Sequence, residues 1–265
     1  MKYLRNTLIV LALLVTLVAA LLWFLPARWA LPWIEPQLHG VRLQQVHGSV
    51  WDGEAGDVIA VDGQRLGPLQ WQVSRRALLG DMHLHVVFEG LQLTYSGSTR
   101  HLPDGRIESD GLHLNVALDA RATYARTPLG QPLGELQLDV EHFLLQGGWP
   151  VELKAQGLWQ HAAVRTDDGE IPLGDMQVEA QSQGGAIQAQ WHDVGAGPLQ
   201  VQGQLQLSPL GWRLDTVLRA RQPDPALQHW LTQVGPVAQD GSVHIQQSGG
   251  LASTSPLIDK GVVQP

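Results

Sequence analysis

The sequence predicts an all-β protein: a curved antiparallel sheet of consecutive hairpins, or an open sandwich, behind one N-terminal transmembrane helix. Three observations support this prediction. The stretch from Leu8 to Leu25 is apolar, and its only polar side chain is Thr16. From Val41 onward, apolar and polar residues alternate along segment after segment, the pattern of strands with one buried and one wet face. Glycine-containing turns separate these segments, and no helical period competes until late in the chain.

The apolar run at residues 8–25 predicts a membrane anchor. At about 1.5 Å per residue, its length approaches the roughly 30 Å hydrocarbon core of a bilayer. Lys2 and Arg5 precede the run, and positive charge stays on the cytoplasmic side, so residues 1–7 are predicted to be cytoplasmic. A cleaved signal peptide is the alternative. The stretch after Ala20 offers that alternative a poor cleavage site, because it lacks the small residues a signal peptidase prefers.

Residues 26–40 are rich in tryptophan and proline and predict a juxtamembrane connector that lies partly on the bilayer surface. Pro32 and Pro36 each remove a backbone donor, so any helix here is short or kinked. Indole rings favour the membrane–water interface, because the ring is apolar and its N–H can reach water. Three such side chains cluster at the exit of the anchor: Trp23, Trp29 and Trp33.

A predicted periplasmic β-rich domain at residues 41–247 begins with a strand at Val41–Val46. The dipeptides Asp52-Gly53 and Asp62-Gly63 are typical of tight hairpin turns between apolar runs. Gly48 permits a bulge or a close backbone approach. Two large side chains are predicted to anchor the buried face of these hairpins: Trp51 and Trp71.

Taken together, these pieces resemble the type II secretion system protein N family (general secretion pathway protein N). Members have a short cytoplasmic N-terminus, one membrane anchor and a β-rich periplasmic domain. That domain begins with a Gly-x-Val-Trp-x-Gly-x-Ala-like element, followed by an x-Leu-x-Trp strand and a Leu-Leu-Gly turn. The matching residues here are Gly48, Val50, Trp51, Gly53 and Ala55, then Leu69 and Trp71, then Leu78, Leu79 and Gly80. The block Leu231–Gly235 followed by Asp240-Gly241 looks like the family's closing segment.

Further strands are predicted wherever the two-residue alternation recurs. The segments are 82–86, 91–95, 112–118, 136–140, 151–155, 176–180, 187–191, 199–207, 212–218 and 243–245. One helix is predicted at Ala226–Val234, with Asp224 as N-cap, Pro225 at the first helical position and Gly235 as the C′ residue. We expect the sheet to fold over on itself, with this helix plugging one end. Residues 248–265 are small and polar and predict a disordered tail.

Composition and motifs argue against a catalytic, cofactor or metal site and against nucleic-acid binding. The formal net charge of −8 disfavours nucleic-acid binding, and the absence of cysteine excludes thiolate chemistry. His83 and His85 share one face of a strand and could chelate a metal, but a wet strand face accounts for them with no third ligand implied. An acidic cluster is interpreted as a solvated hairpin tip: Asp167, Asp168 and Glu170. We therefore predict no catalytic residue, no cofactor and no metal.

The resemblance implies a non-enzymatic component of the type II protein secretion system that assists assembly or scaffolding. It would be a single-pass protein of the cell inner membrane, with its C-terminal domain in the periplasm. Its expected partners are other inner-membrane and periplasmic secretion components, and the lipid bilayer through residues 8–25. The alternative is an AsmA-like envelope module that handles or transfers lipid, because a sheet with a continuous apolar face can shelter the acyl chains of a phospholipid.

Overall fold

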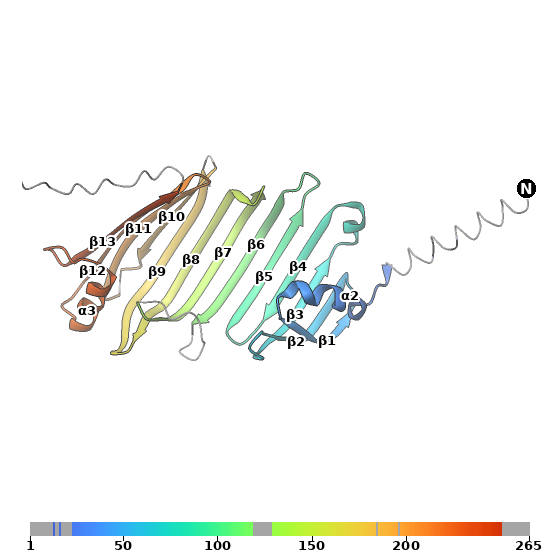
Figure 1. The fold of residues 1–265 in the computed structure, drawn as a ribbon, viewed down its shortest axis with the longest axis horizontal. Coiled ribbons are helices and arrows are strands. Elements are labelled where there is room, and N and C mark those ends of the chain that lie inside the picture. The colour runs from blue at the N-terminus through green and yellow to red at the C-terminus, as the bar shows by residue number, and fades with distance from the viewer. Residues whose placement is uncertain are drawn as a thin grey trace, which may run out of the picture. The chain divides into compact units, whose positions relative to one another are not determined.

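A computed structural model describes residues 13, 16, 23–118, 129–183, 185–195 and 197–250. Its thirteen strands follow one another in chain order within one sheet (Figure 1). The strand pairs with a described register are all antiparallel. The all-β, antiparallel part of the fold prediction is therefore confirmed.

The predicted membrane segment lies largely outside the described residues, as do residues 1–7 and most of the predicted tail. Within the described part of the chain, no helix combines the length and the apolar character needed to span a membrane. The connector is described, and it contains the short helix that its prolines allow: α2 at Ala27–Ile34, followed by the 3-10 helix η1 at Glu35–Leu38.

The chain divides into two compact units, Met1–Asp119 with Glu135–Gly148 and Ala120–Gly134 with Trp149–Pro265. The first contains β1 Arg42–Gly48, β2 Asp52–Ile59, β3 Arg65–Val73, the 3-10 helix η2 Arg75–Leu79, β4 Met82–Glu89, β5 Leu93–His101, β6 Ile107–Leu118 and most of β7 Gln131–Gln146. The second contains β8 Trp149–Thr166, β9 Gly169–Gln183, β10 Ala186–Asp193, β11 Leu199–Ser208, β12 Gly211–Ala220, α3 Pro225–Val234 and β13 Ser242–Gly250.

The first hairpin turns two residues earlier than predicted. The N–H of Ser49 donates to the Asp52 carbonyl (2.8 Å), which places Val50 and Trp51 at the centre of the turn. Gly53, predicted to lie in the turn, instead belongs to β2, where it pairs with Gly48. The side chain of Ser49 explains the shift, because its Oγ accepts from the backbone N–H of Asp52 (3.0 Å). The turn predicted at Asp62-Gly63 is confirmed by a bond from Gly63 N–H to the Ala60 carbonyl (3.0 Å).

The strand predicted at 91–95 begins later than expected. β5 starts at Leu93, and Leu91 is 99% exposed at the hairpin tip. The N–H of Gly90 closes this turn on the Leu93 carbonyl (2.8 Å). A turn that itself contains an apolar residue continues the alternation, so the pattern alone placed the strand boundary two residues too early.

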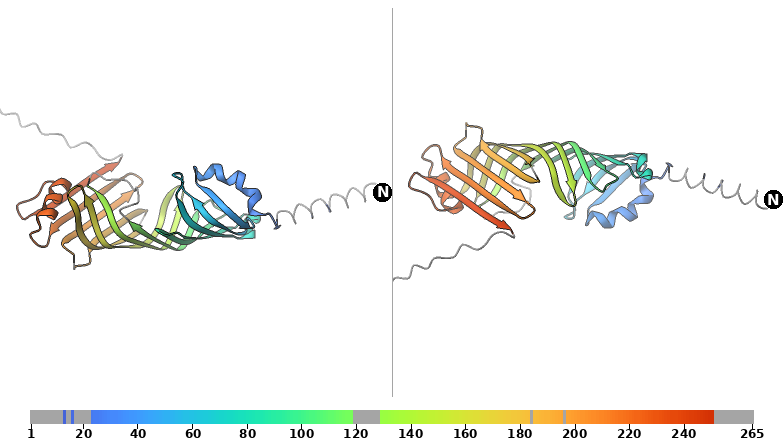
Figure 2. Two further views of the ribbon diagram at one scale, coloured as in Figure 1. Left: turned by 90° about the horizontal axis from the view of Figure 1, so that it is seen from below. Right: turned by 90° about the horizontal axis from the view of Figure 1, so that it is seen from above.

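In the first unit, α2 packs against β1 (Figure 2). Ala27 on the helix and Val46 and Ala55 on β1 and β2 are buried together. Half-buried side chains surround this small core: Leu31, Leu43, Leu69 and Trp71. The face of the sheet that carries Trp71 is therefore its apolar face.

In the second unit, α3 lies against the apolar face of the sheet and contacts β9, β12 and β13. Leu227 and Leu231 are fully buried there with Leu199 and Val243. The predicted N-cap is confirmed, because the Asp224 carboxylate accepts from the N–H groups of Ala226 (2.9 Å) and Leu227 (3.2 Å).

Gly235 directly follows the last residue of α3, as predicted, but it does not adopt the left-handed conformation typical of a glycine at the end of a helix. Its backbone is extended, with φ 177°. Pro236 comes next in the chain, and a residue before proline is driven to extended backbone.

Candidate functional site

The first two family-like elements come together at the start of the sheet. A Cβ atom on Gly48 would lie 2.5 Å from the Asp52 carbonyl oxygen, so only glycine permits this approach of the chain. Trp51 and Ala55 are buried, and Leu69 and Trp71 pack beside Ala55. The structure thus gathers residues that are up to 23 positions apart, from Gly48 to Trp71, into one cluster.

Trp71 joins this cluster by both its ring and its polar atom. The ring lies over Gly53, where an added Cβ would come within 2.4 Å of Cζ2. Its Nε1–H donates to the Val50 carbonyl (3.2 Å). The Trp51 carbonyl accepts from the N–H of Val73, which ends β3, the strand that contains Trp71 (2.6 Å). The first turn is therefore fixed against β3.

The same turn holds the chain that leaves the predicted anchor. The N–H of Val50 donates to the carbonyl of Leu25 (3.0 Å), the last residue of the apolar run. Pro26 forms an isolated bridge with Ser49, and Ala27 is buried against the sheet. We call this arrangement the anchor junction: residues 25–27 together with Ser49 and Val50. These contacts fix residues 25–27 to the first hairpin of the sheet.

The third family-like element lies on the surface. Leu78, Leu79 and Gly80 end the 3-10 helix η2, and Gly80 adopts a left-handed φ of 90°. Leu78 is 51% and Leu79 is 89% exposed, so neither side chain contributes to a core. This element is exposed to solvent, whereas the other two elements pack together at the start of the sheet.

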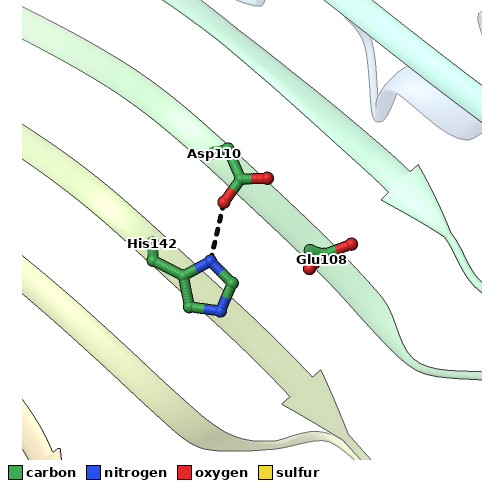
Figure 3. Close-up of side chains that lie close together, drawn as sticks. All are labelled: Glu108, Asp110 and His142. Carbon is green, nitrogen blue, oxygen red and sulfur yellow. Dashed lines mark hydrogen bonds and ion pairs between the residues drawn. The ribbon is translucent and has the colours of Figure 1, made fainter.

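A polar group on β6 and β7 was not predicted from the sequence (Figure 3). The Nδ1 atom of His142 lies 2.6 Å from Asp110 Oδ1, and ligand atoms of Glu108, Asp110 and His142 all lie within 4.8 Å of one another. Asp110 and His142 are 32 positions apart, so no local motif could have indicated the group. Its chemistry suits an ion pair between neighbouring strands, and its donor set could also hold a divalent cation.

The histidines predicted to share a strand face do so. His83 and His85 both line an open hollow of about 570 Å³ that also contains Gln72, Ser98, Glu108 and Asp110. His85 Nδ1 is 2.8 Å from Ser98 Oγ, and His83 Nδ1 is 3.5 Å from an Asp81 carboxylate oxygen. These two side chains thus have separate partners. Of the predicted acidic cluster, Glu170 lies in β9, directly opposite Arg165 of β8, and pairs with it (3.4 Å).

Comparison with known proteins places this chain in a family. The family model described as Type II secretion system (T2SS), protein N matches residues 39–246. The chain belongs to the type II secretion system protein N family. The "Type II secretion system protein N" of Aeromonas hydrophila is 26% identical over 210 residues, which cover 77% of this chain and 82% of that relative. No solved structure matches the chain.

The protein N match confirms the resemblance drawn from the short motifs. It begins at His39 in the connector and ends at Gln246, so it covers β1 to β12 and the first part of β13. Membership of the protein N family assigns the chain to type II secretion, a protein-transport system.

Proposed function

We propose that this protein is a non-enzymatic scaffold that assists assembly of the type II secretion apparatus. Residues 8–25 anchor it in the cell inner membrane, with residues 1–7 in the cytoplasm and the sheet in the periplasm. Family membership supports the secretion role. The Lys2 and Arg5 flank and the uninterrupted apolar run support the topology.

The anchor junction is the observation that carries the scaffold proposal. A scaffold must hold its partner-binding surface at a defined place relative to the membrane. The bond from Val50 to Leu25 and the burial of Ala27 against Val46 and Ala55 fix the chain leaving the anchor to the first strands.

The wet face of β10, β11 and β12 supplies a polar surface for a protein partner. Gln190, Gln204 and Asp215 lie directly opposite one another across these three strands. Gln204 is exposed at the centre of this row. Amide side chains can donate and accept hydrogen bonds, so the row suits a polar, reversible contact with a periplasmic or inner-membrane component of the apparatus.

Site-specific photocrosslinking in cells that carry the apparatus tests the proposal. A photoreactive residue at Gln204 should crosslink to another secretion component. The same residue at Gln64, exposed in the β2–β3 turn, is the matched control. Equal labelling at the two positions, together with unchanged secretion and unchanged levels of the other components after deletion of this gene, would contradict the scaffold role.

An AsmA-like lipid-handling role is the second candidate, and one row of side chains favours it. Phe88, Tyr95 and Leu114 oppose one another across β4, β5 and β6, and Tyr95 and Leu114 are only half-buried. A partly exposed apolar row could receive an acyl chain. Extraction of the purified protein followed by mass spectrometry separates the candidates. Stoichiometric phospholipid without co-purifying secretion components would favour the lipid role.

A further inference from the structure

The short connection between β3 and β4 presents two leucines to solvent in a fixed conformation. Leu78 and Leu79 are 51% and 89% exposed. Ser74 Oγ accepts from the N–H of Arg76 (3.2 Å) at the start of η2, and the N–H of Gly80 donates to the Ala77 carbonyl (3.1 Å) at its end. Both ends of η2 are thus closed by hydrogen bonds, so the leucines are held outward rather than left exposed by fraying.

The same 3-10 helix carries two cations in a protein of net charge −8. Arg75 and Arg76 precede the exposed leucines in η2, with Ala77 between them. The nearest acid in the sequence, Asp81, is engaged by Arg100, whose Nε lies 3.2 Å from its carboxylate, and by His83 at 3.5 Å. Two apolar side chains and two cations therefore lie together on one exposed turn.

Arg75 also connects this turn to the end of the apolar run. Its guanidinium carbon lies 4.8 Å from the centroid of the Trp23 ring, a cation–π contact. Trp23 and Phe24 are both exposed. The leucine–arginine turn thus lies beside the point at which the predicted anchor meets the sheet.

We propose that η2 is a second membrane contact, in which Leu78 and Leu79 enter the interfacial layer of the bilayer while Arg75 and Arg76 approach lipid phosphates. This inference rests on the proposed anchoring by residues 8–25. Arginine stems can lie along apolar lipid while their guanidinium groups remain at the headgroups. Exposed Trp29 and Trp33 on α2 have the chemistry of the same interface. The turn and the anchor would together fix the tilt of the first strands against the membrane.

Charge complementarity selects the lipid surface over a protein partner. Anionic headgroups attract nearby cations and contribute roughly a fivefold gain in the surface-bound population for each arginine. The position beside Trp23 keeps the turn within reach of the bilayer that residues 8–25 would enter. A protein partner would need to reach this turn between the sheet and the membrane surface.

Depth-dependent fluorescence quenching tests the inference. The chain contains no cysteine, so Leu79→Cys can be labelled with an environment-sensitive dye in the full-length protein without other changes. The protein is reconstituted in vesicles of phosphatidylethanolamine and phosphatidylglycerol with some nitroxide-labelled phospholipid. Leu91→Cys is the matched control. Leu91 is as exposed as Leu79, but it follows the last residue of β4, whereas η2 precedes the first.

We expect the dye at position 79 to be blue-shifted and quenched by nitroxide lipid, and the dye at position 91 to be neither. Arg75→Glu with Arg76→Glu should reduce the quenching at position 79. Arg65→Glu, at the far end of β3, should not.

The inference is overturned if quenching at position 79 is no stronger than at position 91. It is also overturned by a blue shift at position 79 without lipid quenching, because that result would indicate that a protein covers the turn. Carbonate extraction of the same vesicles reports separately on the anchor. Resistance to extraction with an unquenched position 79 rejects the second contact alone.

Discussion

Trp71 lies over Gly53, the residue directly opposite it across β2 and β3. The same relationship recurs twice in the second unit, where Trp191 lies over Gly203 and Trp212 lies over Gly249, each pair directly opposed. Glycine weakens a strand because it has no side chain to pack. Here the space it leaves is filled by the neighbouring indole, so packing of the ring offsets that loss of stability. This pairing links Gly53 of the first family-like element to Trp71 of the second.

Trp71→Ala should lower the free energy of unfolding by about 2–4 kcal/mol, because it removes a packed ring. Trp71→Phe should lower it by about 1 kcal/mol, because it mainly loses the hydrogen bond to the Val50 carbonyl. Gly53→Ala should be costly in the natural protein and less costly once Trp71 is alanine, since the ring is then gone and only the Ser49 carbonyl oxygen, 2.7 Å from an added Cβ, still opposes the substitution.

Urea denaturation of the natural protein, Trp71→Ala, Gly53→Ala and the double variant forms a double-mutant cycle. Equal costs of Gly53→Ala with and without the indole would show that the two residues do not compensate.

Asp193 predicts an acid-sensitive contribution to stability. Burial raises the pKa of this carboxyl, but hydrogen bonds from the N–H groups of Val201 (2.9 Å) and Gly195 (3.0 Å) and from Arg221 outweigh burial and lower the pKa overall. A depressed pKa stabilises the fold above the unfolded value of about 3.9, and this stabilisation is lost as the pH falls through the folded value.

Asp193→Asn should therefore cost about 1–3 kcal/mol at neutral pH, with a gap that narrows below about pH 4. Urea denaturation at a series of pH values measures the gap. Asp168→Asn, in the exposed β8–β9 turn, is the control and should change stability little. A gap that stays constant down to strongly acidic pH would contradict the assigned role of the carboxylate.

The group formed by Glu108, Asp110 and His142 is predicted to act as a cross-strand ion pair rather than a metal centre. An exposed pair of this kind contributes about 0–1 kcal/mol, so His142→Gln should change the melting temperature only slightly. Chelation should leave the melting temperature of the natural protein unchanged. A rise in melting temperature on adding Zn²⁺ that disappears in His142→Gln would instead establish a metal site.

Structural features that depend on neighbouring residues could be predicted well from the sequence, whereas contacts between distant residues could not. Asp224 and Pro225 marked the start of α3 correctly, because an N-cap acts on backbone atoms two or three residues away. The Asp52-Gly53 turn was misplaced, because the competing hydrogen bonds of Ser49 are not visible in a dipeptide rule. Strand lengths were underestimated, since β8 runs for 18 residues through interruptions of the alternation.

The candidate site shows the same difference between local motifs, which the sequence reveals, and long-range contacts, which it does not. The sequence indicated which residues belong to the short motifs, but it could not indicate that Val50 would bond to Leu25, because that contact depends on the turn geometry. Likewise, the meeting of Asp110 and His142 depends on the register of β6 and β7. One residue of slip between strands would move every side chain to the other face.

The topology of the anchor is the last prediction. Lys2 and Arg5 lie before the apolar run, and positive residues next to a membrane span favour retention in the cytoplasm. A reporter that is active only in the periplasm, fused after Gly249, should therefore be active, and the full chain should resist carbonate extraction. Replacing both cations with glutamate should lower reporter activity by weakening the orientation bias, whereas Arg65→Glu, within the sheet, should not. Recovery of a shortened, soluble periplasmic form would show that residues 8–25 are a cleaved signal peptide, and the anchor junction would then mark the beginning of the mature chain.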